Sequence, residues 1–145
     1  MSREELLRRA GLDPELAPVG YAPTRLQLFR FSAVTWNAHR IHYDELYARS
    51  EGHGGVVVHS TLRGQQLLGV ALRWMGDHGE VSAFAWRNLR PAFAGEHRTC
   101  RGDITSVTVD SGSLVVTITL DELDDAGDRG ATGSATVRIP VGDRQ

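Results

Sequence analysis

Hydrophobic and polar residues alternate along most of the second half of the chain. Alternation is typical of a β-strand with one buried face, because successive side chains of a strand point to opposite faces of the sheet. Turn-forming residues at 110–113 and 124–130 interrupt the alternation. The pattern predicts four strands, which are Val81–Leu89, His97–Val109, Leu114–Leu120 and Ala131–Ile139.

A long segment before these strands has the periodicity of a helix. From about Ser60 to Met75, hydrophobic side chains recur three or four positions apart; they include Leu67, Val70, Ala71, Trp74 and Met75. The last two turns are hydrophobic around most of their circumference, which predicts a helix enclosed by other structure. Gly76 is well placed to end this helix.

The N-terminus carries the pattern of a helix start. The Ser2 hydroxyl can accept a hydrogen bond from the Glu5 amide while the Glu5 side chain reaches back, which is a capping box. The sequence therefore predicts a short helix at 2–10. Residues 16–23 are predicted to form a loop.

The segment that follows has weaker periodicity. Residues 25–34 are rich in leucine and phenylalanine and are predicted to form a strand, although the alternation is imperfect. Residues 37–42 form a polar loop that carries two histidines. Residues 43–50 are predicted to form a short helix whose buried side can hold Leu46 and Tyr47.

The order of these elements indicates the fold class. Runs of strands with the helices grouped elsewhere in the chain are typical of an α+β fold. No repeat, linker or low-complexity segment interrupts the sequence, which predicts one domain over residues 1–145. We expect an antiparallel sheet that wraps around the long central helix at about 60–75.

Composition narrows the possible functions. The net charge of −2 and the pI near 6.3 argue against an electrostatic binder of nucleic acids or membranes. All 16 basic residues are Arg, which excludes a Schiff-base lysine and a P-loop lysine. Cys100 is the only cysteine, so neither an intrachain disulfide nor a cysteine zinc cluster is possible. With no hydrophobic leader or membrane-length segment, we expect a cytoplasmic protein.

Two motifs carry a family resemblance. The stretch 31–44 (FSAVTWNAHRIHYD) and the stretch 57–60 (VVHS) resemble the MaoC-like (hydratase 2) hot-dog family. They are most similar to the branch with the mesaconyl-C4-CoA hydratases and the mitochondrial 3-hydroxyacyl-thioester dehydratases. The resemblance extends over about 25–140 and implies a single hot-dog domain. It also implies a lyase, a hydratase or dehydratase of enoyl or 3-hydroxyacyl thioesters of CoA or acyl carrier protein, with no cofactor besides this thioester substrate.

The resemblance also implies site residues. His42 matches the catalytic histidine and is expected to be the general acid/base, because histidine exchanges protons near neutral pH. Asn37 stands where most members have a catalytic Asp, and we expect it to orient water or the substrate hydroxyl. Ser60 stands where a Gly amide commonly contributes to the oxyanion hole. The residues expected to bind substrate are Ser60, His59, His39 and Arg40.

Each of these residues also has a simpler structural interpretation. His42 can be a histidine that is hydrogen-bonded within the fold at the start of a helix, and Asn37 can be a turn residue. His39 can be a solvent-facing residue of the loop, and His59 can orient the loop. Arg40 can form an ion pair with Asp44. A metal site at His39 and His42 lacks a third ligand at regular spacing, so no metal is expected. The acidic segment 121–128 is expected to be a solvated hairpin loop.

Two further functions stay open. Hot-dog thioester sites generally lie between two protomers, so the resemblance implies a homodimer or a heterodimer with another hot-dog subunit. Asn37 and Ser60 depart from the common family residues, which leaves room for a non-catalytic or half-catalytic subunit that completes a partner's site. A hot-dog thioesterase usually has a carboxylate on the central helix, and residues 62–72 contain none.

Overall fold

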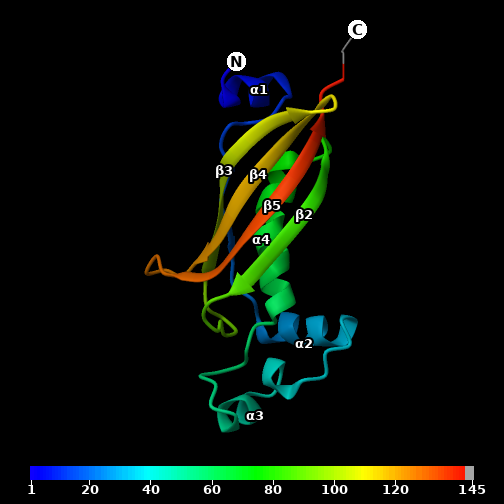
Figure 1. The fold of residues 1–145 in the computed structure, drawn as a ribbon. Helices are drawn as coiled ribbons and strands as arrows, with labels where there is room; N and C mark the ends of the chain where they lie inside the picture. Colours follow the sequence, from blue (N-terminus) through cyan, green and yellow to red (C-terminus); the bar gives the residue numbers. More distant parts are fainter. Residues whose placement is uncertain (143–145) are drawn as a thin grey trace.

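A curled antiparallel sheet wraps around one long helix in the computed structural model, which describes residues 1–142 (Figure 1). The strands lie in the order β1-β3-β4-β5-β2. Their bounds are β1 Val19–Tyr21, β2 Glu80–Asn88, β3 Arg98–Asp110, β4 Ser113–Leu123 and β5 Arg129–Pro140. The central helix is α4, Ser60–Met75. The four strands predicted after the helix, and the helix itself, are confirmed, with ends that differ by at most three residues.

The alternation along β4 explains how the sheet meets the helix. Every second residue of the strand is buried, and Val116, Ile118 and Leu120 are fully inaccessible. They belong to one core with Leu67 and Val70 of α4. The other face of β4 is half-buried, as expected for a sheet with one side packed on a core.

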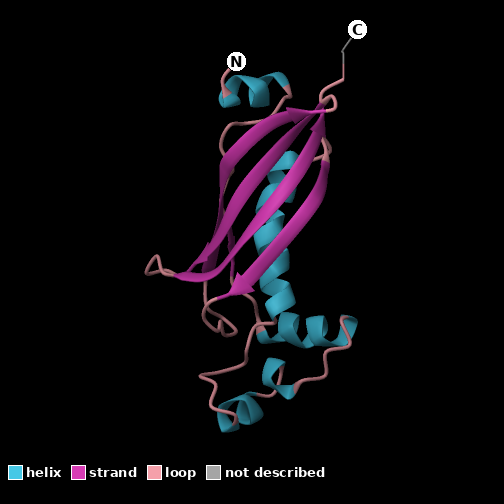
Figure 2. Ribbon diagram, in the orientation of Figure 1, coloured by secondary structure: helices cyan, strands magenta, loops and turns pink. Residues whose placement is uncertain are grey.

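The prediction that α4 is enclosed was wrong for the single chain. The sheet covers only one side of the helix, as Figure 2 shows. On another side Leu72 is 44% exposed, and nothing lies within 4 Å of the position that a Cβ on Gly69 would take. A hydrophobic pattern around most of a helix therefore shows which of its faces can be buried, and the rest of this chain does not cover all of these faces.

Two features of the N-terminal region differ from prediction. Helix α1, Arg3–Arg9, begins where predicted, and Ser2 Oγ accepts from the Glu5 amide at 3.1 Å. The Glu5 carboxylate instead pairs with Arg9, so the capping box is only half formed. The predicted loop 16–23 contains strand β1, which pairs with β3 but is only three residues long.

The strand predicted at 25–34 was wrong, because this segment is helix α2, Arg25–Val34. Its capping box is complete: Thr24 Oγ1 accepts from the Gln27 amide at 3.1 Å, and Gln27 Oε1 accepts from the Thr24 amide at 2.8 Å. Leu28 and Ser32, four positions apart, are its buried residues. In this segment the capping box and a buried helical stripe favour a helix, although the content of leucine and phenylalanine suggested a strand.

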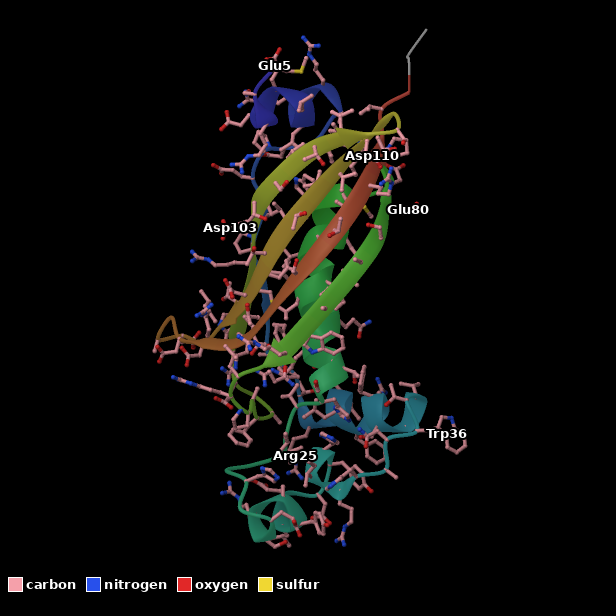
Figure 3. The ribbon with its side chains drawn as sticks, viewed as in Figure 1. Glu5, Arg25, Trp36, Glu80, Asp103 and Asp110 are labelled. Carbon is pink, nitrogen blue, oxygen red and sulfur yellow. The ribbon has the colours of Figure 1, made fainter. Side chains whose placement is uncertain are left out.

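Helix α2 ends in an unusual turn. Trp36 has a φ of 56° and is 94% exposed. It lies beyond the end of the helix and points away from the sheet (Figure 3). The chain then passes through a short 3-10 helix, η1 (Arg40–His42), into α3, Glu45–Ser50. The predicted helix at 43–50 is thus confirmed with a later start, but Leu46 is 83% exposed and Ala48 is its buried residue.

The helical segment α2–α3 lies at the N-terminal end of α4 (Figure 1). A second, smaller core holds it there, made of Leu28, Val56, Val58 and Ala92. The backbone of Val57 adds a hydrogen bond to the Ile41 carbonyl at 2.9 Å. No helix within the described residues is long and hydrophobic enough to cross a membrane.

Candidate active site

Four of the predicted site residues meet beside the start of α4. His42 from η1, His59 immediately before α4 and Asn37 from the turn after α2 line one surface pocket of about 450 Å³. Ser60 lines the same pocket. Residues 88–91, after β2, close another side of it. Among the described residues, no carboxylate lines this pocket.

The hydrogen bond of the His42 ring determines that Nε2, rather than Nδ1, can act as a base. Its Nδ1 lies 2.7 Å from the carbonyl oxygen of Val57. A carbonyl oxygen can only accept, so Nδ1 carries the proton and Nε2 of the neutral ring has a free lone pair. Burial lowers the pKa of His42, the hydrogen bond to Val57 opposes this, and His39 and His53 lower the pKa further. His42 is therefore a neutral base at neutral pH.

His59 lines the pocket but is almost fully buried, with 1% of its surface exposed. Its ring stacks on the ring of His42, with 3.9 Å between centroids and 16° between planes. Its Nε2 lies 2.7 Å from Ser32 Oγ, across 27 positions of sequence. Burial lowers the pKa of His59 to about 4, and the nearby His42 contributes to this shift. His59 thus stays uncharged at neutral pH.

Asn37 takes part in the turn and also faces the pocket. Its Oδ1 accepts from the backbone N–H of His39 at 3.2 Å, and its own N–H donates to the Ser32 carbonyl at 2.9 Å. The side chain therefore has the turn role that the sequence left open. The same residue lines the pocket of His42, so both interpretations are compatible in one geometry.

Ser60 begins α4 and is exposed. The first helical hydrogen bond of α4 runs from the Arg63 amide to the His59 carbonyl. The amides of residues 60–62 therefore precede the helical ladder, and the helix dipole gives this end a partial positive charge. Beside His42, such an end favours an anion or a developing oxyanion.

His39 and Arg40 do not line this pocket. His39 is exposed and caps η1, with Nδ1 accepting from the Ile41 amide at 3.3 Å. Arg40 pairs with Asp44 at 2.7 Å, and its guanidinium lies 4.5 Å from the centre of the Tyr47 ring. Within this chain both residues have the structural roles that the sequence left open, and a contact to substrate stays a prediction.

Sequence reasoning missed a buried ion pair at the floor of the pocket. Arg63 lines the pocket, is 1% exposed and binds both carboxylate oxygens of Glu122, at 2.6 and 3.1 Å. It also donates to the carbonyls of Arg90 and Gly130. The Tyr21 hydroxyl donates to Glu122 at 2.7 Å, and burial with this hydrogen bond raises the pKa of Tyr21.

A sequence signal for this pair exists. Arg63 is a charged residue four positions before Leu67 and seven before Val70, on the hydrophobic stripe of α4. Glu122 continues the buried series of β4 that ends with Leu120. A charge on a buried face is expected to have a partner of opposite charge within the fold.

Comparison with known proteins places the chain in a family. Residues 11–94 match the family described as hydroxyacyl-thioester dehydratase type 2. The mesaconyl-C(4)-CoA hydratase of Chloroflexus aurantiacus is 43% identical over 86 residues, which is 54% of this chain and 30% of that protein. The chain thus spans less than a third of the length of this relative.

Solved structures share the fold. The (R)-hydratase of A. caviae involved in PHA biosynthesis aligns with a TM-score of 0.79 and 20% identity, covering 88% of this chain and 96% of that one. A chain of the ChsH1–ChsH2 complex of Mycobacterium tuberculosis aligns with a TM-score of 0.76 and 16% identity, covering 88% and 97%. These likenesses confirm the predicted hot-dog fold.

Proposed function

Because the chain belongs to the hydroxyacyl-thioester dehydratase type 2 family, we propose that it reversibly hydrates enoyl thioesters of CoA or an acyl carrier protein, with His42 as the general acid/base. The observation that carries the proposal is the contact of His42 Nδ1 with the Val57 carbonyl. It leaves Nε2 as the proton acceptor, and the first residues of α4, Ser60 and Thr61, line the same pocket as His42.

His42 suffices for both proton transfers. In hydration, Nε2 takes a proton from water while the water oxygen bonds to C3 of the enoyl group. The electrons move through C2 to the thioester oxygen, and the amides of residues 60–62 stabilise the negative charge there. The protonated His42 then gives its proton to C2, so that water is added across the double bond and the ring is regenerated. Dehydration follows the same steps in reverse.

The lining of the pocket supports a mechanism with a single acid/base. His42 and His59 are its two histidines, and no carboxylate of the described residues belongs to it. His59 is buried and hydrogen-bonded to Ser32, which makes it unsuitable for proton exchange with a substrate. Asn37 supplies an amide that can orient water but cannot take its proton. The missing carboxylate also speaks against the thioesterase alternative.

We include a second hot-dog subunit in the proposal. Leu72 on α4 is 44% exposed, and β2 pairs only with β5 among the described strands, so its other edge is free. Both features suit contact with a similar subunit. The similar ChsH1–ChsH2 structure is a complex of two different components, which supports a heteromeric assembly; a homodimer is the other form of the proposal. A cytoplasmic location is part of the proposal, since Cys100 is a free, buried thiol.

The alternative function is that of a non-catalytic subunit that completes a partner's site. The replacement of the common Asp by Asn37 and of Gly by Ser60 favours it. The two functions differ in one measurable property, because hydration depends on His42 of this chain only if this chain is the enzyme.

The test uses the purified chain with crotonyl-CoA and with a dicarboxylic enoyl-CoA, a class suggested by the name of the Chloroflexus relative. Hydration is followed as loss of the absorbance of the conjugated thioester. We expect turnover that His42→Ala abolishes and that His97→Ala, in an exposed histidine paired with Asp125, leaves unchanged. Full activity of His42→Ala would overturn the mechanism. Activity that appears only after addition of a second hot-dog protein, and that His42→Ala in this chain does not reduce, would favour the alternative.

A further inference from the structure

A chain of three contacts connects α2 to the proposed catalytic base. Ser32 is buried within α2, and its hydroxyl bonds His59 Nε2 at 2.7 Å. His59 stacks on His42 at 3.9 Å with nearly parallel planes. Phe31, the neighbour of Ser32, also packs against the His59 ring at 4.7 Å between centroids. His59 is thus fixed by α2 and presents its ring to His42.

We propose that Ser32 and His59 are positioning residues for the hydratase reaction: the Ser32–His59 hydrogen bond fixes the plane of the His59 ring, and the stacked His59 ring fixes the plane of His42. The inference rests on the proposed function, because it assigns a purpose to the orientation of His42. His59 is 1% exposed and acts through His42 rather than on substrate.

Two constraints are needed to aim Nε2 of His42. The Val57 carbonyl holds Nδ1 at 2.7 Å, but a ring held at one atom can still turn about that hydrogen bond. A second ring stacked on its face removes this freedom. Val57 and His59 are two positions apart, so the short segment that leads into α4 supplies both constraints. Orientation held in advance lowers the cost of reaching the reactive geometry.

The charge states agree with this role. Two stacked imidazoles at 3.9 Å cannot both be protonated without strong repulsion. His59 Nδ1 has no hydrogen-bond partner among the described residues, so a protonated His59 would bury an unpaired N–H. Burial keeps the pKa of His59 at about 4. His39 and His53 are the other titratable groups that act on His42.

The first test is Ser32→Ala. We expect kcat to fall about tenfold to hundredfold, the cost of a misplaced catalytic group, with KM changed by less than about threefold. A looser His59 admits water to the face of His42, so the pKa of His42 rises toward its ordinary value and the acid limb of the kcat/KM profile moves to higher pH. The pKa of His42 is measured directly by NMR titration of its ring protons.

Two controls separate positioning from stability. Ile118→Val removes one methylene-sized group from the sheet core, and Ser50→Ala removes an exposed hydroxyl that bonds the Tyr47 carbonyl. Both should leave kcat and the pKa of His42 unchanged, and Ile118→Val lowers the melting temperature. A fall in kcat for Ile118→Val as large as that for Ser32→Ala would overturn the proposal.

The second test replaces His59. His59→Phe keeps a flat ring against His42, whereas His59→Ala removes it, so we expect the Phe variant to retain more of kcat. Because Ser32 acts through His59, Ser32→Ala should cost nothing more in kcat when added to His59→Phe. Additive losses would overturn the chain of contacts.

The NMR titration does not need turnover. If the wild-type chain hydrates no thioester, either alone or with a hot-dog partner, the proposed function fails, while the rise in the pKa of His42 in Ser32→Ala still tests the contacts. The inference would be overturned if Ser32→Ala lowered the melting temperature but left the pKa of His42 as in the wild type. Ser32 would then have a structural role only.

Discussion

Arg63 and Glu122 form a two-point ion pair between α4 and β4, with N–O distances of 2.6 and 3.1 Å and both residues inaccessible to solvent. The pair lies beneath the pocket of His42, since Arg63 also lines that pocket. The carbonyls of Arg90 and Gly130 and the hydroxyl of Tyr21 complete its hydrogen bonds. The floor of the proposed active site is thus fixed to the sheet.

Removing one partner of this pair should destabilise the fold strongly. Glu122→Ala leaves the guanidinium of Arg63 buried without its carboxylate, at a cost of about 3–5 kcal/mol in the free energy of unfolding. The measurement is a urea denaturation curve. The double variant Arg63→Met/Glu122→Leu should recover most of the loss, because it leaves no unpaired charge. A cost below about 1 kcal/mol for Glu122→Ala would contradict a buried pair.

Stability should fall between pH 6.5 and pH 4. The pKa of His59 is about 4 in the folded chain and about 6.5 in the unfolded chain, so the unfolded chain binds more protons in this range. The stabilisation is present above pH 6.5 and is lost as the pH falls through about 4, by on the order of 3 kcal/mol. The lowered pKa of His42 acts in the same direction.

Urea unfolding at pH 7 and at pH 4.5 measures this loss, with His59→Phe as the matched comparison. A phenyl ring does not titrate, so the variant should lose less stability over the same interval. Equal losses in both proteins would show that other groups cause the pH dependence.

The two roles of Asn37 can be separated. Asn37→Asp keeps the oxygen that accepts from the His39 amide and adds a carboxylate beside His42. The negative charge should raise the pKa of His42 and move the acid limb of kcat/KM to higher pH. Asn37→Ala loses the acceptor as well, and we expect kcat to fall about tenfold to hundredfold. Identical pH profiles for Asn37→Asp and the wild type would place residue 37 too far from His42 to act on the reaction.

Ser60→Gly tests the proposed oxyanion site. The substitution keeps the backbone N–H at the start of α4 and removes the side chain beside it. If a thioester oxygen approaches these amides, kcat/KM should rise by several-fold, a change of about 1 kcal/mol in transition-state binding. Thr61→Gly, one position further into α4, serves as the comparison for altered backbone freedom. A decrease in kcat/KM for Ser60→Gly alone would indicate that the hydroxyl itself binds substrate.

Local signals explain which parts of the fold the sequence predicted. The alternation in β4 and the helical stripe of α4 are long, regular patterns, and both elements were found. Strand β1 has three residues, too few to show a period. In α2 the Thr24–Gln27 capping box outweighs a leucine-rich composition that suggested a strand.

The candidate site also has parts that local sequence patterns predict and parts that they do not. His42 and Asn37 lie in a short motif, so their meeting in one pocket followed from sequence. The contacts that fix them connect distant positions: Ser32 with His59 across 27 residues, and Arg63 with Glu122 across 59. No local sequence pattern predicts a contact between residues so far apart in the chain. Burial of a single polar residue on a hydrophobic face was the available hint for Arg63 and Glu122, and it does not identify the partner.

The free edge of β2 has a consequence for handling the protein. Among the described strands, β2 (Glu80–Asn88) pairs only with β5, so the backbone groups on its other side have no strand partner; the central residues of β2 are small or aromatic. Such an edge accepts any extended strand, including one from an unfolded copy of the same chain. If no other subunit covers this edge, the protein should therefore precipitate at a rate that rises steeply with concentration. Light scattering over time measures this aggregation, and a hot-dog subunit that covers the edge of β2 should keep the scattering low when it is added.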